Sequence, residues 1–144
     1  MKKIKPSEFA KTVKRDVVRY RSAAVAALYD EAVKIINKSI PITPYDKGHL
    51  RGSAFVSMPK EHGNQVEVEL GYGGFAAKYA LAVHEMGTGG KDINWSEPGT
   101  GNKYLEKPFD AASKGQAKRL QANAMKRFLS RFTAIITQAA TEPK

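Results

Sequence analysis

Apolar residues recur at three- and four-residue steps over residues 7–39, which is the pattern of an amphipathic helix. The positions with this spacing are Phe9, Val13, Val17, Tyr20, Ala24, Leu28, Ala32, Ile35 and Ile36. Ser7 is placed to cap the first turn, while Pro41 and Pro44 end the pattern because proline interrupts a helix interior. Such a helix extends about 50 Å at ~1.5 Å per residue. A small sheet cannot cover that length, so we expect part of the helix to pack on something else.

The pattern changes to strict alternation over residues 52–72. The apolar positions are Ala54, Val56 and Met58 in the first half, and Val66, Val68 and Leu70 in the second. Residues 59–64, between the two halves, contain proline, glycine and asparagine, which favour turns. The pattern therefore predicts an antiparallel hairpin with one solvated face.

A short helix is expected at Ala76–Glu85, followed by a glycine-rich loop over residues 87–103 that holds the only tryptophan, Trp95. Loops of this length without structure of their own are usually functional or mobile. The spacing also fits short strands at Ile93–Trp95 and Lys103–Leu105.

A last amphipathic helix is predicted over residues 108–140, with Pro108 at its first position and Gly115 as a point where it can kink. The resulting fold class is α+β, with long N- and C-terminal helices packed on a small antiparallel β-sheet and a long Gly-rich loop. With 144 residues the chain is expected to form a single domain with its own core.

Charge is distributed unevenly along the chain. Residues 1–21 and residues 107–144 each carry eight Lys/Arg against two carboxylates, a net charge of +6 each, whereas residues 22–106 carry −2. A solvated helix face accounts for much of this, and a surface facing DNA or an acidic subunit accounts for the remainder. The longest apolar run, Ala23–Tyr29, is far below the roughly 18 residues of a membrane span. A basic start without an apolar core is no secretory signal, so we expect a soluble protein.

Sequence motifs for catalysis or metal binding are missing. The chain has no cysteine, and its three histidines lie on three different segments, which disfavours a zinc site. His84-Glu85 begins like a metalloprotease helix, but Thr88 stands where the second histidine is needed. Gly87–Asp92 lacks the spacing of a phosphate-binding loop. We therefore expect no enzyme activity, no catalytic residue, no cofactor and no metal.

The stretch between the first helix and the hairpin contains residues with specific local roles. Asp46 is placed to cap a short helical turn near Gly48 or His49, and Leu50 is the apolar residue that would dock this turn on a core. Arg51 presents a rigid charged fork that suits a carboxylate or a phosphate. On these local grounds alone, the stretch is an ordinary helix-to-strand connection.

The stretch Pro44-Tyr45-Asp46-Lys47-Gly48-His49-Leu50-Arg51-Gly52-Ser53 also resembles the N-terminal signature of a family of small tailed-phage virion proteins. These are neck, head–tail joining or tail-completion proteins, often labelled minor capsid or tail component. Two later stretches, Tyr79–Thr88 and Tyr104–Ala112, fit the same family pattern in order. His84 and Met86 depart from it, because an aromatic or aliphatic residue and a phenylalanine are more usual there. The resemblance covers the chain from about the first helix to the last.

The resemblance implies a structural virion protein, made in the bacterial host cytoplasm and located in the neck or tail end. Its copies would form a homo-oligomeric ring, a hexamer or dodecamer, around the DNA channel. The implied partners are the adjoining connector or adaptor and tail-terminator proteins and, non-specifically, packaged DNA, but no membrane. The residues expected at interfaces are Tyr45, Asp46, Arg51 and Trp95, and those expected to face DNA or another polyanion are Lys118, Arg119, Lys126 and Arg127.

Arg51 and Trp95 are expected to be interface anchors because arginine and tryptophan are enriched among the residues that dominate interface energetics. The acidic residues with which Arg51 could pair in a neighbouring subunit are Glu67, Glu69, Glu85 and Asp92. The alternative function is a small basic DNA-binding module, which the charge alone supports. The sequence contains no helix-turn-helix spacing, no zinc ligands and no aromatic base-stacking cluster that would strengthen this alternative.

Overall fold

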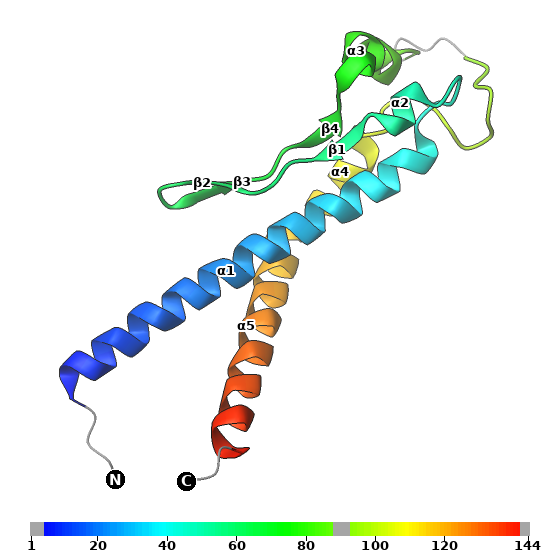
Figure 1. Ribbon diagram of the computed structural model, residues 1–144. Helices are drawn as coiled ribbons and strands as arrows, with labels where there is room; N and C mark the ends of the chain where they lie inside the picture. Colours follow the sequence, from blue (N-terminus) through cyan, green and yellow to red (C-terminus); the bar gives the residue numbers. More distant parts are fainter. Residues whose placement is uncertain (1–4, 88–92, 142–144) are drawn as a thin grey trace. The chain divides into compact units, whose positions relative to one another are not determined.

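The computed structural model describes residues 5–87 and 93–141, with side chains up to residue 129 in the last helix. The elements in chain order are α1 (Pro6–Ser39), η1 (Ile40–Ile42), α2 (His49–Gly52), β1 (Ala54–Val56), β2 (Lys60–His62), β3 (Gln65–Glu67), β4 (Leu70–Tyr72), η2 (Gly74–Ala76), α3 (Ala77–Glu85), α4 (Glu106–Ser113) and α5 (Gln116–Thr141). Long terminal helices and small antiparallel sheets confirm the α+β class (Figure 1). Part of the predicted Gly-rich loop, residues 88–92, lies outside the described residues.

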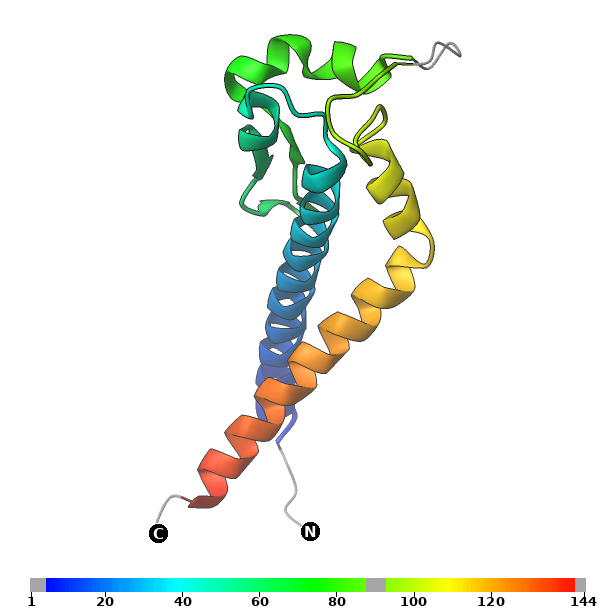
Figure 2. The ribbon, with the colours of Figure 1, turned by 90° about the vertical axis from the view of Figure 1, so that its right-hand side faces the viewer.

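The chain divides into two compact units. The helical unit comprises Met1–Leu28 and Ala117–Lys144, and the central unit comprises Tyr29–Gln116. Figure 2 shows α1 as one uninterrupted helix, so this element belongs to both units. The single domain stays a prediction, because α1 continues from one unit into the other.

The predicted N-terminal helix is present as the 34 residues of α1. Pro6 is its first residue, one position before the expected cap, and the N–H groups of Glu8 and Phe9 donate to the Lys5 carbonyl. Proline suits a first helical position because its missing N–H has no intrahelical acceptor there. Pro41 lies in η1, where the α-helix has ended as predicted.

The predicted hairpin is present as two short ladders, β1 with β4 and β2 with β3, both antiparallel. In Figure 1 the ladders follow one another along a single extended ribbon. The turn between β2 and β3 consists of only Gly63 and Asn64, and Gly63 has a φ of 59°. A positive φ at the first of two central residues fits a type II′ turn, whose twist matches that of a hairpin. The turn is therefore tighter than the expected 59–64.

One extra residue separates the two ladders. The register pairs Val56 with Leu70 and Lys60 with Glu67. Three residues of one strand, 57–59, therefore lie opposite only two residues of the other, 68 and 69. One extra residue on one strand of an antiparallel pair is a β-bulge. Pro59 fits this position because it has no N–H to donate to a ladder. The bulge shifts the alternation, so Met58 is exposed instead of lying on the apolar face that the pattern predicts.

The C-terminal segment forms two helices, so the prediction of one helix over 108–140 is wrong. Gly115 lies between α4 and α5 with a φ of 70°. This left-handed conformation commonly ends helices and costs glycine little. Pro108 lies in the first turn of α4, where a missing N–H is tolerated.

The short helix expected at Ala76–Glu85 is confirmed as α3, whereas neither expected strand, Ile93–Trp95 or Lys103–Leu105, forms in the structure. Lys103 has a φ of 52°, which takes the backbone out of the extended conformation that a strand requires. Among the described residues it is the only non-glycine residue with positive φ.

The hydrophobic core of the central unit brings distant stretches together. Leu50 of α2, Ala76 and Ala80 around the start of α3, and Tyr104 before α4 are buried against one another. The partly buried side chains around them are Ile42, Tyr72, Tyr79, Val83 and Leu105. Leu50 therefore docks its turn as predicted. In the described ranges, every helix is too short or too polar to cross a bilayer.

Candidate functional site

Arg51 is bound within its own chain. Its Nε donates to the Thr43 carbonyl at 2.9 Å, and its Nη2 forms an ion pair with Glu97 Oε2 at 2.6 Å. The guanidinium also lies 5.1 Å from the centroid of the Tyr45 ring, within cation–π range. These contacts join α2 to the end of η1 and to the loop between α3 and α4, which contains Glu97. The carboxylate that Arg51 contacts within its own chain is therefore Glu97, and a further partner in a neighbouring subunit stays a prediction.

Asp46 is exposed, and α2 has no side-chain cap. Gly48 occupies the N-cap position with a φ of 80°. A Cβ at this glycine would lie 3.2 Å from Cε2 of Tyr45, so a larger residue would face both backbone strain and a tight contact. The left-handed glycine therefore replaces the carboxylate cap that the sequence pattern predicts.

A cavity of about 480 Å³ lies beside this turn. Its lining is largely aromatic and aliphatic and includes Tyr45, Asp46, Leu50, Tyr79, Val83, Met86, Ile93 and Trp95. The Ser96 hydroxyl donates to the Tyr45 carbonyl, which ties the loop to the turn. Trp95 is half-buried, and its Nε1 is 3.5 Å from where a Cβ of Gly101 would lie. Tyr45, Asp46 and Trp95 thus share one cavity, and Arg51 contacts Tyr45 next to it.

Three hydroxyl groups meet where α1 ends. Ser39 Oγ donates to the Tyr104 carbonyl at 2.7 Å, and Thr43 Oγ1 donates to the Ser39 carbonyl at 2.9 Å. The Tyr72 hydroxyl lies 2.7 Å from both Ser39 Oγ and Thr43 Oγ1. Ser39 and Thr43 have no exposed surface. Together these contacts fix the end of α1 to β4 and to Tyr104.

The hydroxyl cluster has three protons for four short contacts, since each hydroxyl donates only once. If Ser39 and Thr43 donate to their carbonyls, the single proton of Tyr72 can reach only one of the two remaining oxygens. A buried polar group that loses its hydrogen bond costs about 1–3 kcal/mol. The cluster therefore stabilises this junction only while all three side chains keep their positions.

Tyr104 connects the cluster to α3. Its hydroxyl donates to the Ala80 carbonyl at 2.7 Å, and its ring packs edge-on against the rings of Tyr72 and His84, with centroids 5.0 Å apart in both pairs. Burial raises the pKa of Tyr104 to about 12, because the charged phenolate would lose its hydration, and the nearby Tyr72 and Tyr79 add to this. Tyr104 is therefore a neutral core residue over the whole physiological pH range.

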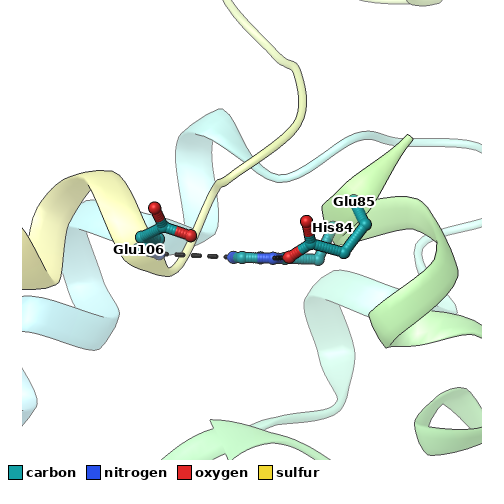
Figure 3. Close-up of side chains that lie close together, drawn as sticks. All are labelled: His84, Glu85 and Glu106. Atoms are coloured by element: carbon teal, nitrogen blue, oxygen red, sulfur yellow. Dashed lines mark hydrogen bonds and ion pairs between the residues drawn. The ribbon is translucent and has the colours of Figure 1, made fainter. Parts of the chain in front are cut away.

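His84, Glu85 and Glu106 lie close together between the end of α3 and the start of α4 (Figure 3). The Glu106 backbone N–H donates to His84 Nε2 at 3.3 Å, so this nitrogen is unprotonated. The proton is accordingly assigned to Nδ1, which lies 2.8 Å from Glu85 Oε1. Both ring nitrogens of His84 are thus used, one of them to cap α4.

Lys103 supplies the positive charge for this cluster. Its Nζ lies 2.8 Å from Glu85 Oε2 and 2.6 Å from Glu106 Oε2. Hydrogen bonding from Lys103, then from His84, lowers the pKa of Glu85 below its usual 4.5, and hydrogen bonding to Glu106 and Glu85 raises the pKa of Lys103 above 10.5. Potential ligand atoms of His84, Glu85 and Glu106 lie within 4.8 Å of one another. However, the Lys103 ammonium already forms ion pairs with both carboxylates. The cluster is an ion-pair network.

Positive charge is concentrated in the helical unit. Its two segments hold fourteen Lys/Arg and three Asp/Glu, a net charge of +11, while the central unit holds ten and eleven, a net charge of −1. Lys118, Arg119 and Lys126 are exposed, and Arg127 is half-buried. At about 100° per residue, Arg127 lies roughly 180° around α5 from Lys118. The four residues expected to face a polyanion therefore do not share one helix face.

The buried hydroxyls were not singled out from the sequence, although a signal exists. Ser39 and Thr43 continue the four-residue steps of the apolar stripe from Ile35, so they occupy positions that the periodicity assigns to the core. The partners of these hydroxyls, Tyr72 and Tyr104, lie far along the chain. Only the folded arrangement reveals that pairing.

The chain matches no protein-family model, no curated protein and no solved structure. A functional assignment therefore depends on the motifs and contacts described above.

Proposed function

We propose that the protein is a structural virion protein of a tailed bacteriophage, a subunit of a homo-oligomeric ring in the neck that joins head to tail around the DNA channel. The observation that carries this proposal is the resemblance of three ordered stretches to the neck and tail-completion family. The structure supports it by where those stretches lie. Leu50, Ala80 and Tyr104, one from each stretch, pack together in the core of the central unit.

The interface residues of this proposal surround the cavity beside α2. Tyr45 and Asp46 are exposed and Trp95 is half-buried, and a largely apolar cavity of this size suits a side chain from an adjoining subunit. Arg51 has a structural part in this surface, because it holds Tyr45 and the Glu97 loop in place. Trp95→Ala is expected to leave circular dichroism near wild type and to reduce incorporation into particles. Loss of folding in isolation would assign Trp95 to the core.

The basic helical unit suits a channel surface that faces DNA. Reversing the charge of Arg119 and Lys126, which lie within roughly 20° of each other around α5, is expected to impair assembly or genome retention, since phosphates attract cationic surfaces regardless of sequence. Circular dichroism checks that the variant is folded. Normal yields of genome-filled virions would show that these charges are only solvated.

The decisive experiment is interruption of the coding sequence in the phage that carries it, followed by electron microscopy of the lysate. We expect filled or emptied heads and separate tails, with infectivity restored by the protein supplied from a plasmid. Complete infectious particles without the protein would eliminate the proposal. Cryo-electron microscopy of wild-type particles would then identify the ring position and its copy number.

The alternative function is a small basic DNA-binding module, which the +11 charge of the helical unit favours. Binding of this kind is sequence-independent and weakens steeply with salt. The two functions are distinguished by molar mass in solution, measured with and without short duplex DNA at increasing salt. A small species that binds DNA and never joins virion parts would support the module. An enzyme is not proposed, because His84, Glu85 and Glu106 already form an ion-pair network with Lys103.

A further inference from the structure

The N-terminal half of α1 exposes large apolar side chains. Phe9, Val13 and Val17 lie at four-residue steps and are 61%, 44% and 62% exposed. At about 100° per residue these three fall within roughly 80° of one another around the helix, and Asp16 lies beside Phe9 and Val13. We call these four residues the α1 face. A contiguous row of exposed apolar side chains, unlike a single one such as Val18, is typical of a contact surface.

A second face is formed by α5. Met125 and Leu129 are 44% and 51% exposed, and they lie about 140° or more from Leu120, which is half-buried. Lys118 falls within roughly 20° of both exposed residues around the helix. We call Lys118, Met125 and Leu129 the α5 face. It is turned away from the side of α5 on which Ala124 is buried.

The charges of the two faces are complementary. The described part of the helical unit has two carboxylates, Glu8 and Asp16, and both lie on α1, whereas residues 117–141 contain none. Among the described residues, Asp16 Oδ1 lies 3.8 Å from Arg19 and 3.9 Å from Arg15, and this oxygen is buried without a hydrogen bond. Two α5 faces brought together would oppose cations only. An α1 face against an α5 face places Asp16 near Lys118.

We propose that the α1 face of one copy binds the α5 face of the next copy. Two different patches that recognise each other make a heterologous contact, and repeating it around an axis closes a ring. This inference rests on the proposed ring and names its subunit contact. It also assigns Lys118 to the contact between copies. Arg119 and Lys126 stay available to bind a polyanion such as DNA.

The absence of cysteine from the sequence permits a direct test by disulfide trapping. Val13 and Met125 are the middle residues of the two faces, so they are the pair to join. Val13→Cys and Met125→Cys are prepared as separate proteins, mixed and oxidised. A disulfide-linked dimer that forms at least about tenfold more in the mixture than in either protein alone is expected. Equal amounts in all three samples would overturn the proposal.

A matched pair of substitutions tests the α1 face independently. Val17 and Val18 are adjacent valines of similar exposure, 62% and 67%, but Val18 lies roughly 180° around the helix from Phe9. Val17→Asp is expected to weaken self-association at least about tenfold by sedimentation, while Val18→Asp, with the same change of charge, leaves it unchanged. Equal effects of the two substitutions would show that the α1 face is not the contact.

The mass of the assembly separates failure of this inference from failure of the proposed function. A ring found in solution or on particles without the mixed disulfide means that other surfaces form it, and the α1–α5 contact is rejected while the neck function stands. A chain that forms no ring in either setting rejects both. A disulfide formed only within single double-variant chains, Val13→Cys with Met125→Cys, would show instead that α5 of the same chain covers the α1 face.

Discussion

The central unit and the helical unit are held together by different interactions. The central unit has almost no net charge and contains buried hydroxyls, a buried tyrosine and an arginine with three contacts inside the chain. The helical unit has a net charge of +11. Both units leave large apolar side chains exposed, among them Phe9 and Val17 in the helical unit and Phe75 and Leu81 in the central unit. The difference between the units therefore lies in their charge and in the buried hydrogen bonds that fix the fold of the central unit.

Two aromatic residues, one in each unit, show how much depends on burial. Tyr104 is 1% exposed, with a hydrogen bond to the Ala80 carbonyl, whereas Phe9 is 61% exposed on the first turns of α1. The two side chains are similar in size and apolar area. Their contributions to stability therefore depend on burial and hydrogen bonding, and not on residue type.

The largest expected effect follows from truncating this pair. Tyr104→Ala should lower the free energy of unfolding by about 3–5 kcal/mol, because it leaves a cavity and an unpaired Ala80 carbonyl. Phe9→Ala should change it by about 0.5 kcal/mol or less. Urea denaturation followed by circular dichroism measures both. Similar losses in the two variants would remove the distinction between the units.

A smaller effect is expected from the arginines. Arg51→Ala should lower the free energy of unfolding by about 1–3 kcal/mol, because it removes hydrogen bonds of a charged group to Thr43 and Glu97. Arg15→Ala, which removes a 3.9 Å contact in the helical unit, should stay within about 0.5 kcal/mol. Thermal and urea melts check the pair. An Arg51→Ala protein as stable as wild type would return Arg51 to a role between subunits.

Alkaline pH should affect the central unit through Tyr104. Its folded-state pKa of about 12 lies above the usual 10, so its contribution to stability is complete below pH 10 and is lost as the pH rises through 12. Urea denaturation from pH 9 to 12 should therefore show a smaller loss in Tyr104→Phe than in wild type. The pKa of Lys103 is also raised, which acts in the same direction and leaves a residual loss. Identical pH profiles of the two proteins would contradict the burial of this phenol.

The smallest effect is expected from metal removal. Lys103 already forms ion pairs with both Glu85 and Glu106, and His84 uses both ring nitrogens in hydrogen bonds, so EDTA should leave the melting temperature unchanged. A fall of several degrees, reversed by adding a divalent cation, would show that the cluster binds a metal.

The local sequence patterns determined the elements of the fold. Four-residue apolar steps predicted α1, alternation predicted the hairpin, and both are present. Leu50 was assigned to a core from its isolated position in a polar turn, and it is buried. These predictions succeed because helix and strand periodicity depend on neighbours within a few residues.

The break at Gly115 and the bulge at residues 57–59 show where local patterns are insufficient. An apolar stripe continues across Gly115, so the sequence predicts one helix, and the positive φ that ends α4 has no periodic signal. The bulge adds one residue to one strand, and no residue type in that strand indicates the extra position. Neither feature can be read from the spacing of apolar residues, because glycine permits a positive φ without requiring it and a bulge depends on the register of the partner strand.

The partners of polar side chains were decided by tertiary structure alone. The sequence shows that Arg51 needs an anion and that Ser39 and Thr43 lie at apolar positions, but not which groups satisfy them. Glu97 is 46 residues from Arg51, and Tyr104 is 65 residues from Ser39. Hydrogen bonds need their atoms within about 3 Å, and only the folded backbone sets such distances between remote residues. The sequence thus determined which elements form, and the tertiary structure decided which side chains they bring together.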